Sequence, residues 1–376
     1  MMSFYESHSQ SKGLNFEKAF SSVSTTSIFN SLKENNLEIN QLISLLSPQA
    51  EDCLEQMAQR AQAISKSQFG KTIQLYAPFY LSNYCDNACL YCGFNLNSNI
   101  QRRKLTLKEV EAEAQFISAE GLKQVLILTG ESRTESPVSY IQDCVALLKK
   151  YFTSVSIEVY PLSEQEYAQL VMQGVDGLTI YQEVYDEQLY AQMHPSGAKK
   201  DYKFRLAAPE RGARARLRHI SIGALLGLGD WRKEVFFLGL HAKYLQDNFP
   251  EVEIGVGLPR IRPLGHGSAV DGFRPISQVT DRNIVQMILA LRIFLPRLNI
   301  TISTRENAEF RENLIPLGIT RMSAGSVTNV GGYTLYKEKN EHSAQFEIQD
   351  KRSVSQIKTL LEKKGYQPVF KDWLDL

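Results

Sequence analysis

Residues 73–92 read IQLYAPFYLSNYCDNACLYC, an apolar run that leads within a few residues into three closely spaced cysteines. The run at 73–81 is rich in aromatic and apolar residues and predicts a buried strand. Cys85, Cys89 and Cys92 follow it with the spacing C-x3-C-x2-C. A loop that carries three thiols therefore follows the carboxyl end of this strand. The surroundings of the loop depend on the rest of the chain.

Seven further β-rich runs follow and alternate with longer amphipathic segments. Segments such as 105–121 and 280–295 have helical periodicity, so a helix is expected after each strand except the last. Eight such repeats predict a (β/α)8 TIM-type barrel, with a doubly wound open sheet as the alternative. The seven runs lie at 124–129, 154–160, 176–183, 219–225, 253–259, 299–305 and 319–325.

The 376-residue chain has an ordinary globular composition, with 43% hydrophobic residues and a formal net charge of +1. We expect an N-terminal helical segment at 1–71, the barrel at 72–330 and a C-terminal extension at 331–376 with a helix near 353–364. No dense basic stretch suggests nucleic-acid binding, and no apolar run of about twenty residues suggests a membrane span. The start of the chain does not resemble a signal peptide, and the clustered cysteines do not resemble a disulfide framework, so we expect a reducing cytoplasm.

The cysteine triplet fits an iron–sulfur cluster better than a structural zinc ion. A structural zinc site would need a fourth ligand, and no histidine lies in the loop to supply it. Cys53 and Cys144 stand alone inside predicted helices and are expected to be small core residues. Three ligands from one loop suit a four-iron cluster with one iron open to a small molecule, whereas the ferredoxin pattern needs a fourth cysteine. A three-cysteine zinc site is the alternative.

Polar residues follow other predicted strands, at the carboxyl ends where α/β barrels build their active sites. Glu158 is placed to accept hydrogen bonds from ribose hydroxyls, and Arg305 to bind an anionic substrate group. Hydroxyls and amides at 323–326 would complete that anion site. The residues alone assign no role to Gln182, Glu183, Arg260 and Arg262. Four histidines show no mutual ligand spacing and are expected to be structural: His194, His219, His241 and His266.

The spacing C-x3-C-x2-C, with Tyr91 before the last cysteine, resembles the signature of the radical S-adenosylmethionine (SAM) enzymes. The resemblance implies that the three cysteines hold a 4Fe-4S cluster whose open iron chelates the amino and carboxylate groups of SAM. Thr129-Gly130-Glu131 partly matches a Gly-Gly-Glu turn of that family, which implies contact with the SAM amino group. The implied SAM-binding residues are Tyr91, Gly130, Glu131, Glu158 and, at the SAM carboxylate, Arg205.

Longer motifs resemble the aromatic amino acid lyases of that superfamily, and among them the 2-iminoacetate synthases, the tyrosine lyases of bacterial thiamine biosynthesis. The resemblance implies that the Cα–Cβ bond of L-tyrosine is cleaved to 2-iminoacetate and p-cresol, while SAM yields methionine and 5′-deoxyadenosine. It also implies that Arg305 and Ser323 bind the substrate carboxylate and that Tyr80 contacts the substrate. The motifs are PFYLSNYCDNACLYCGF (78–94), LTGE (128–131), IEVYPL (157–162), YQEVY (181–185), ISTRE (302–306) and QPVFKDW (367–373).

The same resemblance implies two kinds of partner and leaves related enzymes as alternatives. Thiazole synthase would receive the easily hydrolysed 2-iminoacetate, and a flavodoxin or ferredoxin would supply the electron. The hydrogenase-maturation tyrosine lyases need a second cluster at a C-terminal C-x2-C, but this chain has no cysteine after Cys144. A tryptophan lyase, or another radical SAM enzyme acting on an amino acid, is the remaining alternative.

Overall fold

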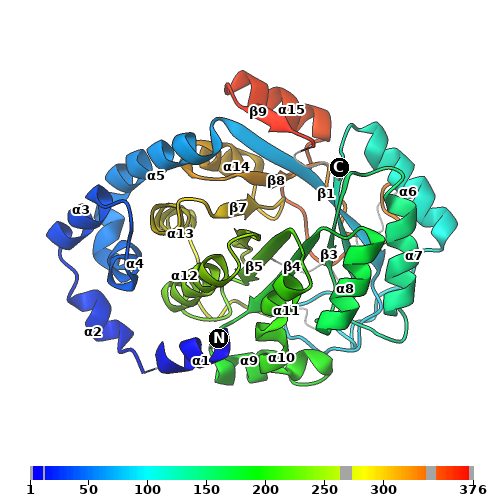
Figure 1. The fold of residues 1–376 in the computed structure, drawn as a ribbon, viewed down its shortest axis with the longest axis horizontal. Helices are drawn as coiled ribbons and strands as arrows, with labels where there is room; N and C mark the ends of the chain where they lie inside the picture. Colours follow the sequence, from blue (N-terminus) through cyan, green and yellow to red (C-terminus); the bar gives the residue numbers. More distant parts are fainter. Residues whose placement is uncertain (1–2, 12, 263–272, 336–343, 372–376) are drawn as a thin grey trace.

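The computed structural model describes residues 3–11, 13–262, 273–335 and 344–371. Its centre is a closed barrel of eight parallel strands, which confirms the predicted (β/α)8 fold and excludes the open sheet (Figure 1). β1 pairs with both β2 and β8, and this double pairing closes the ring. All eight predicted runs form strands: β1 (Thr72–Ser82), β2 (Gln124–Thr129), β3 (Ser154–Glu158), β4 (Gly177–Glu183), β5 (His219–Ala224), β6 (Glu253–Gly257), β7 (Asn299–Ile302) and β8 (Arg321–Ser323).

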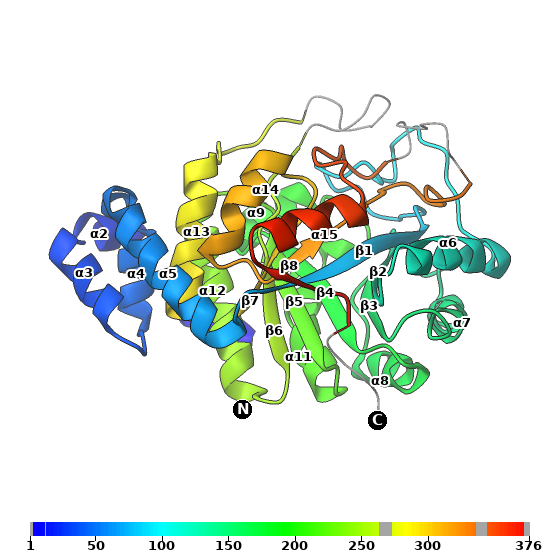
Figure 2. The ribbon, with the colours of Figure 1, turned by 90° about the horizontal axis from the view of Figure 1, so that it is seen from above.

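Helices follow strands β1 to β7 and cover the outside of the barrel (Figures 1 and 2). Thr106, Ser163 and Thr280 each cap a helix with a side-chain oxygen that accepts a hydrogen bond from the backbone three residues on. Within the described residues, no helix is both long and apolar enough to cross a bilayer. The helices are α6 (Leu107–Ala119), α7 (Val138–Leu148), α8 (Glu164–Gln173), α9 (Glu187–Met193), α10 (Tyr202–Leu206), α11 (Ala208–Arg214), α12 (Trp231–Asn248), α13 (Asp281–Phe294) and α14 (Ala308–Leu314).

The N-terminal helices lie on one side of the barrel and pack against α12 and α13 (Figure 1). Gln286 on α13 donates to the carbonyl oxygens of Leu45 and Ser47, across 3.0 and 2.8 Å. Phe4 stacks on His241 with ring centroids 3.9 Å apart. These contacts fix the segment to the barrel. Its helices are α1 (Phe4–Ser11), α2 (Phe16–Ser21), α3 (Thr25–Lys33), α4 (Ile39–Leu46) and α5 (Leu54–Phe69).

The C-terminal part contains the predicted helix, α15 (Val354–Lys363), and a short strand that the sequence did not predict, β9 (Gln367–Val369). β9 pairs with the first residues of β1, Thr72 to Gln74, ahead of the segment that pairs with β2. Pro368 has no backbone N–H to donate to a neighbouring strand, so the sequence of residues 367–369 does not predict a strand. Asp372 and Trp373 of the last motif lie outside the described residues, as does His266. The division of the chain at residues 71 and 330 stays a prediction.

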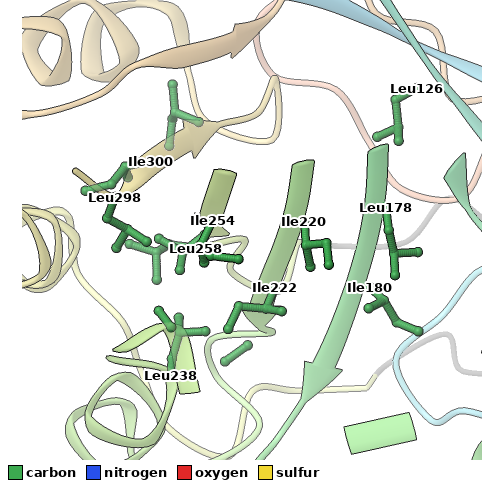
Figure 3. Close-up of a cluster of buried hydrophobic side chains, with 14 of the residues drawn as sticks. Leu126, Leu178, Ile180, Ile220, Ile222, Leu238, Ile254, Leu258, Leu298 and Ile300 are labelled. Atoms are coloured by element: carbon green, nitrogen blue, oxygen red, sulfur yellow. The ribbon is translucent and has the colours of Figure 1, made fainter. Parts of the chain in front are cut away.

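The barrel strands present an apolar outer face and a polar inner one, because side chains alternate along a strand. Figure 3 shows part of the outer layer, where Ile220 and Ile222 of β5 lie near Ile254 of β6. A TIM barrel usually fills its interior with bulky branched residues. Here the inward positions carry many small hydroxyl side chains and leave a cavity, lined among others by Ser156, Thr179, Ser221, Thr301 and Ser303.

Candidate active site

A cavity of about 150 Å³ occupies the barrel interior beneath the cysteine loop. Its walls come from all strands except β6 and from the loops that follow several strands. The structure thereby brings together residues that are up to 270 positions apart in the sequence, from Tyr76 to Phe346. Six of the sequence-predicted site residues line it: Tyr80, Tyr91, Cys92, Glu158, Arg305 and Ser323.

The cysteine loop is held by backbone contacts to two neighbouring loops. The amide of Asp86 donates to the carbonyl of Glu131, and the amide of Leu90 donates to the carbonyl of Met193, both across 3.1 Å. Burial raises the pKa of all three thiols, that of Cys85 to about 11. A metal must therefore displace the thiol protons when it binds. The nearby Lys199 ammonium acts in the other direction on Cys89 and Cys92, because a cation favours thiolate.

Gly130 lets the turn after β2 approach the cysteine loop closely. A Cβ atom at this position would overlap the carbonyl oxygen of Tyr84, which immediately precedes the first cysteine. The amide of Gly130 donates to the carbonyl of Ser82 across 2.8 Å. A side chain here would force the two segments apart, so the requirement for glycine is steric.

Glu131, directly after this glycine, belongs to a buried network of charges. Its Oε1 accepts a hydrogen bond from Arg205 across 2.8 Å, and its Oε2 accepts one from Asn87 across 3.0 Å. Lys199 lies 3.9 Å from Glu131 and donates to Glu183 across 2.8 Å. Burial alone would raise the pKa of Glu131, but Arg205 and Lys199 outweigh it and hold that pKa below its ordinary value. Glu131 is therefore a carboxylate, ready to accept from a cationic ligand.

Glu158 lies on the cavity wall and differs electrostatically from Glu131. Burial raises its pKa to about 7, and the negative charge of Glu183 adds to the rise, although Arg305, Lys199 and Arg205 oppose it. The carboxyl group at the end of β3 is thus readily protonated near neutral pH. In either state it can accept a hydrogen bond from a ligand hydroxyl.

Arg305 has no carboxylate partner among the described residues, although it is surrounded by protein. Its guanidinium lies 3.5 Å from the ring centroid of Phe346, and burial lowers its pKa. Tyr80 donates to the side-chain oxygen of Gln345 across 2.6 Å, and the Ser323 hydroxyl accepts from the amide of Thr304. The predicted trio of Arg305, Tyr80 and Ser323 shares one cavity, and its substrate-binding roles stay predictions.

Tyr91 points its hydroxyl at His194, with the oxygen 2.7 Å from Nε2. The other ring nitrogen of His194 lies 2.7 Å from the carbonyl oxygen of Tyr190, so Nδ1 carries the proton and Nε2 accepts. Burial lowers the pKa of His194 to about 2, which keeps this ring neutral. His194 thus has the structural role that was expected, because it fixes the aromatic residue beside the last cysteine.

Arg260 and Arg262 differ from Arg305 because both are paired. Each contacts the carboxylate of Glu306, Arg262 across 2.7 Å, and Arg260 also donates to Asp281. Arg262 reaches the cavity wall, whereas Arg260 does not. Gln182 is buried, its amide has no hydrogen-bond partner among the described residues, and it lies off the cavity. Of the four residues without a predicted role, Glu183 and Arg262 line the cavity.

Sequence reasoning missed Lys199, Gln345 and Phe346, which contribute to the site from outside the barrel strands. Lys199 follows Gly197, where a Cβ atom would clash with Asn87, so this loop closes against the cysteine loop. The dipeptide Ser196-Gly197 was the one signal for a close approach. Gln345 and Phe346 come from the C-terminal segment, whose sequence carries no sign of the cavity.

The residues present fit a three-cysteine iron–sulfur cluster. Cys85, Cys89 and Cys92 lie close enough to influence one another's pKa, beside the cavity and the Lys199 cation. Within the described ranges, no three His, Cys, Asp or Glu side chains converge on a point suited to one metal ion. A cuboidal cluster uses a different iron for each cysteine, so its ligands need not converge in that way.

Two family models match separate parts of the chain. The Radical SAM superfamily matches residues 79–236, and the Biotin and Thiamin Synthesis associated domain matches residues 258–367. The first match contains the cysteine loop, Glu131, Glu158 and Arg205. The second contains Arg305 and Ser323.

Curated relatives resemble the chain over most of its length. It is 38% identical over 339 residues to a 2-iminoacetate synthase of Salmonella typhimurium strain LT2, over 90% of this chain and 88% of that protein. It is also 38% identical over 343 residues to a 2-iminoacetate synthase of Escherichia coli K12, over 91% and 89%. The X-ray structure of the FeFe-hydrogenase maturase HydG from Carboxydothermus hydrogenoformans is similar with a TM-score of 0.84 and 29% identity, over 98% of this chain and 83% of that one.

Proposed function

Because this chain belongs to the 2-iminoacetate synthase family of radical SAM enzymes, we propose that it cleaves the Cα–Cβ bond of L-tyrosine. Removal of a hydrogen atom from the substrate amino nitrogen starts the reaction. The Cα–Cβ bond then breaks homolytically and leaves 2-iminoacetate and a 4-hydroxybenzyl radical. One electron and one proton convert that radical to p-cresol. The 2-iminoacetate supplies carbon and nitrogen for the thiazole ring of thiamine.

The observation that carries this proposal is Arg305, which has no carboxylate partner among the described residues and lines a cavity beneath a three-cysteine loop. A half-buried guanidinium without a carboxylate partner is suited to bidentate binding of a ligand carboxylate. An amino acid held in this way places its amino group inside the barrel, close to the cysteine loop. Tyr91, Cys92 and Glu158 line the same cavity as Arg305, Tyr80 and Ser323, which supports a site that holds the cofactor and the substrate side by side.

Cys85, Cys89 and Cys92 would hold a 4Fe-4S cluster, and a SAM molecule would bind beside it. When bound, the cluster and SAM supply the 5′-deoxyadenosyl radical that accepts the substrate hydrogen atom. Glu131 is the candidate acceptor for the SAM ammonium group, because its carboxylate is ionised. Arg205 is the candidate partner of the SAM carboxylate, and Glu158 of the ribose hydroxyls. Tyr91 is held beside the last cysteine by His194.

The chain's contribution to the chemistry is positioning, because a primary carbon radical abstracts almost any nearby hydrogen atom. Arg305 binds the substrate carboxylate, Ser323 adds a hydrogen bond, and Tyr80 contacts the substrate near the cysteine loop. These contacts make the amino hydrogen the nearest one to the radical. The enclosed barrel interior also excludes water, which prevents quenching by other donors.

We also propose two partners, which follow from the reactivity of the product and the need for an electron. Thiazole synthase would receive 2-iminoacetate before it hydrolyses, and the match to the Biotin and Thiamin Synthesis associated domain supports a place in this pathway. A flavodoxin or ferredoxin would reduce the cluster.

Anaerobic incubation with SAM, dithionite and L-tyrosine tests the proposal. We expect p-cresol, 5′-deoxyadenosine and 2-iminoacetate, the last detected as glyoxylate after hydrolysis. L-tryptophan serves as the comparison substrate for the related lyases. Absence of p-cresol from a preparation with a full complement of four irons would refute the tyrosine lyase assignment.

A further inference from the structure

The cavity ends, toward the amino ends of the strands, on a buried arginine–histidine pair that the roles above do not use. Arg321 begins β8 and is 9% exposed, and His219 begins β5 and is 3% exposed. Both residues line the cavity. Nη1 of Arg321 donates to Nε2 of His219 across 2.6 Å. The pair therefore forms a charged floor beneath the substrate space.

The positive charge of Arg321 is uncompensated in the part of the chain that the structure describes. No carboxylate pairs with it there, His219 is its one hydrogen-bond acceptor, and its Nε is buried without a partner. A guanidinium carries five N–H donors. A buried cation with unused donors costs free energy unless a ligand satisfies it.

His219 cannot share that charge. Burial, reinforced by Arg321 and Arg218, holds the pKa of His219 well below its ordinary value. The ring is therefore neutral, and its Nε2 accepts from Arg321. This hydrogen bond fixes the direction of the guanidinium, so His219 acts as a positioning residue for Arg321.

Two other buried arginines have purely structural roles, and their hydrogen-bond acceptors can be compared with those of Arg321. Arg311 pairs with Asp350 and donates to the carbonyl of Ser323 across 2.5 Å. Arg292 donates to the carbonyls of Pro296 and Gly318, across 2.8 and 2.7 Å. Neither lines the cavity, whereas Arg321 does and lacks such acceptors.

The space above Arg321 has the shape and surface for an aromatic ring. Tyr181 lies against the barrel wall, where a Cβ atom at Gly223 or Gly257 would come within 2.7 Å of its ring carbons. Glycine at both positions lets the ring sit close to the wall and keeps the barrel centre open. Tyr76 and Leu126 line other parts of the same space. An aromatic ring there could pack on these apolar surfaces.

The depth of the cavity also fits the length of a tyrosine side chain. Ser323 and Arg321 are alternate inward positions of β8, so their levels differ by roughly 7 Å at the usual strand rise. A substrate whose carboxylate is bound by Arg305 and Ser323 therefore reaches the level of Arg321 with the far end of a tyrosine side chain.

We propose that Arg321, positioned by His219, forms a subsite for the phenolic hydroxyl of the substrate. The inference rests on the proposed function and deepens it, because it names the residues that distinguish tyrosine from phenylalanine. The guanidinium donates a hydrogen bond to the phenol oxygen in an enclosed site. An analogue without this oxygen leaves the donor unsatisfied, and such sites discriminate strongly against it.

Equilibrium binding measured by calorimetry tests the subsite on anaerobically reconstituted protein with SAM present. L-tyrosine and L-phenylalanine are titrated into the wild type, Arg321→Gln and the matched control Arg292→Gln. We expect the wild type and Arg292→Gln to prefer tyrosine by at least about tenfold. In Arg321→Gln the ratio falls toward one, because tyrosine affinity drops while phenylalanine affinity is unchanged or higher.

An unchanged ratio of tyrosine affinity to phenylalanine affinity in Arg321→Gln would overturn the subsite. An equal loss of affinity for both amino acids is one form of that result. If Arg321→Gln does not fold, Arg321→Lys decides the question. The lysine ammonium lacks the planar, forked N–H donors of a guanidinium. A reduced preference for tyrosine over phenylalanine in this variant therefore supports the subsite, and an undiminished preference overturns it. Binding needs no turnover, so it is independent of p-cresol formation. A wild type that prefers tyrosine but makes no p-cresol would refute the proposed reaction and leave the subsite supported.

Discussion

Arg205 and Glu131 form a buried ion pair, with Nη1 2.8 Å from Oε1, that joins helix α10 to the turn after β2. Both side chains are mostly enclosed, at 6% and 13% exposure. Each is also a predicted contact of SAM, at opposite ends of its amino acid moiety. The structure thus pairs the two groups that the ligand is expected to engage.

Arg205→Ala should weaken SAM binding and destabilise the fold together. The change leaves Glu131 buried with only Lys199 nearby as a cation, and an uncompensated buried charge costs about 3–5 kcal/mol. SAM titration and urea denaturation measure the two effects. The double variant Arg205→Met with Glu131→Leu removes both charges and should recover stability without recovering SAM affinity. Recovered SAM affinity in the double variant would contradict the assigned roles.

Arg305→Ala should uncouple SAM cleavage from tyrosine cleavage. Without the guanidinium the substrate carboxylate is not fixed, so the ratio of 5′-deoxyadenosine to p-cresol should rise severalfold. Arg305→Lys keeps the charge and should give an intermediate ratio. Unchanged coupling and tyrosine affinity in Arg305→Ala would show that another group binds the carboxylate.

Replacing Cys85, Cys89 or Cys92 by Ala should each abolish turnover and the bound iron. Cys53 and Cys144 are buried away from the site, and the same change there should cost only about 1–3 kcal/mol of stability. Iron content after anaerobic reconstitution separates the two groups. Loss of the cluster in the Cys144→Ala variant would mean that the ligands are misassigned.

Gly130→Ala should disturb the cysteine loop although it adds only a methyl group. The new Cβ atom would overlap the backbone at Tyr84, and overpacking of this kind costs about 1–3 kcal/mol. We expect a lower melting temperature and incomplete iron incorporation. Gly13→Ala is the control, because no atom of the described residues beyond its chain neighbours lies within 4 Å of the added atom there. Full iron incorporation by Gly130→Ala would show that the loop adapts without loss.

Glu158 should make stability fall as pH rises toward neutrality. Its pKa is raised from 4.5 to about 7 by burial and Glu183, so the folded chain keeps a proton that the unfolded chain releases. The contribution of this protonated carboxyl group to the free energy of unfolding is fully present below about pH 4.5 and is lost as pH rises to about 7.

Glu158→Gln lacks this dependence, so its stability relative to the wild type should rise by about 1–3 kcal/mol between pH 4.5 and 8. Urea denaturation of ligand-free protein at several pH values measures the difference. Parallel pH profiles for the two proteins would show that the carboxyl ionises in its ordinary range.

The sequence by itself determined the barrel, the order of its strands and the position of the cysteine loop. Strand–helix alternation is a local property, and parallel strands joined by right-handed crossovers leave few arrangements. The carboxyl end of every strand then lies on one face, so Glu131, Glu158, Arg305 and Ser323 could be placed near Cys85 without coordinates. The cysteine spacing also predicted an iron–sulfur cluster, because three thiols from one short loop suit such a cluster.

Only the tertiary structure decided which charges meet and how deep the cavity runs. The pairing of Arg205 with Glu131, the closure of the Lys199 loop and the strand β9 depend on contacts between segments far apart in the sequence. That Arg321 contacts His219 and no carboxylate among the described residues could not be predicted from the sequence, because the sequence does not show which side chain faces an inward-pointing arginine. Burial and pairing set the free energy of a charge, and both arise only when the chain has folded.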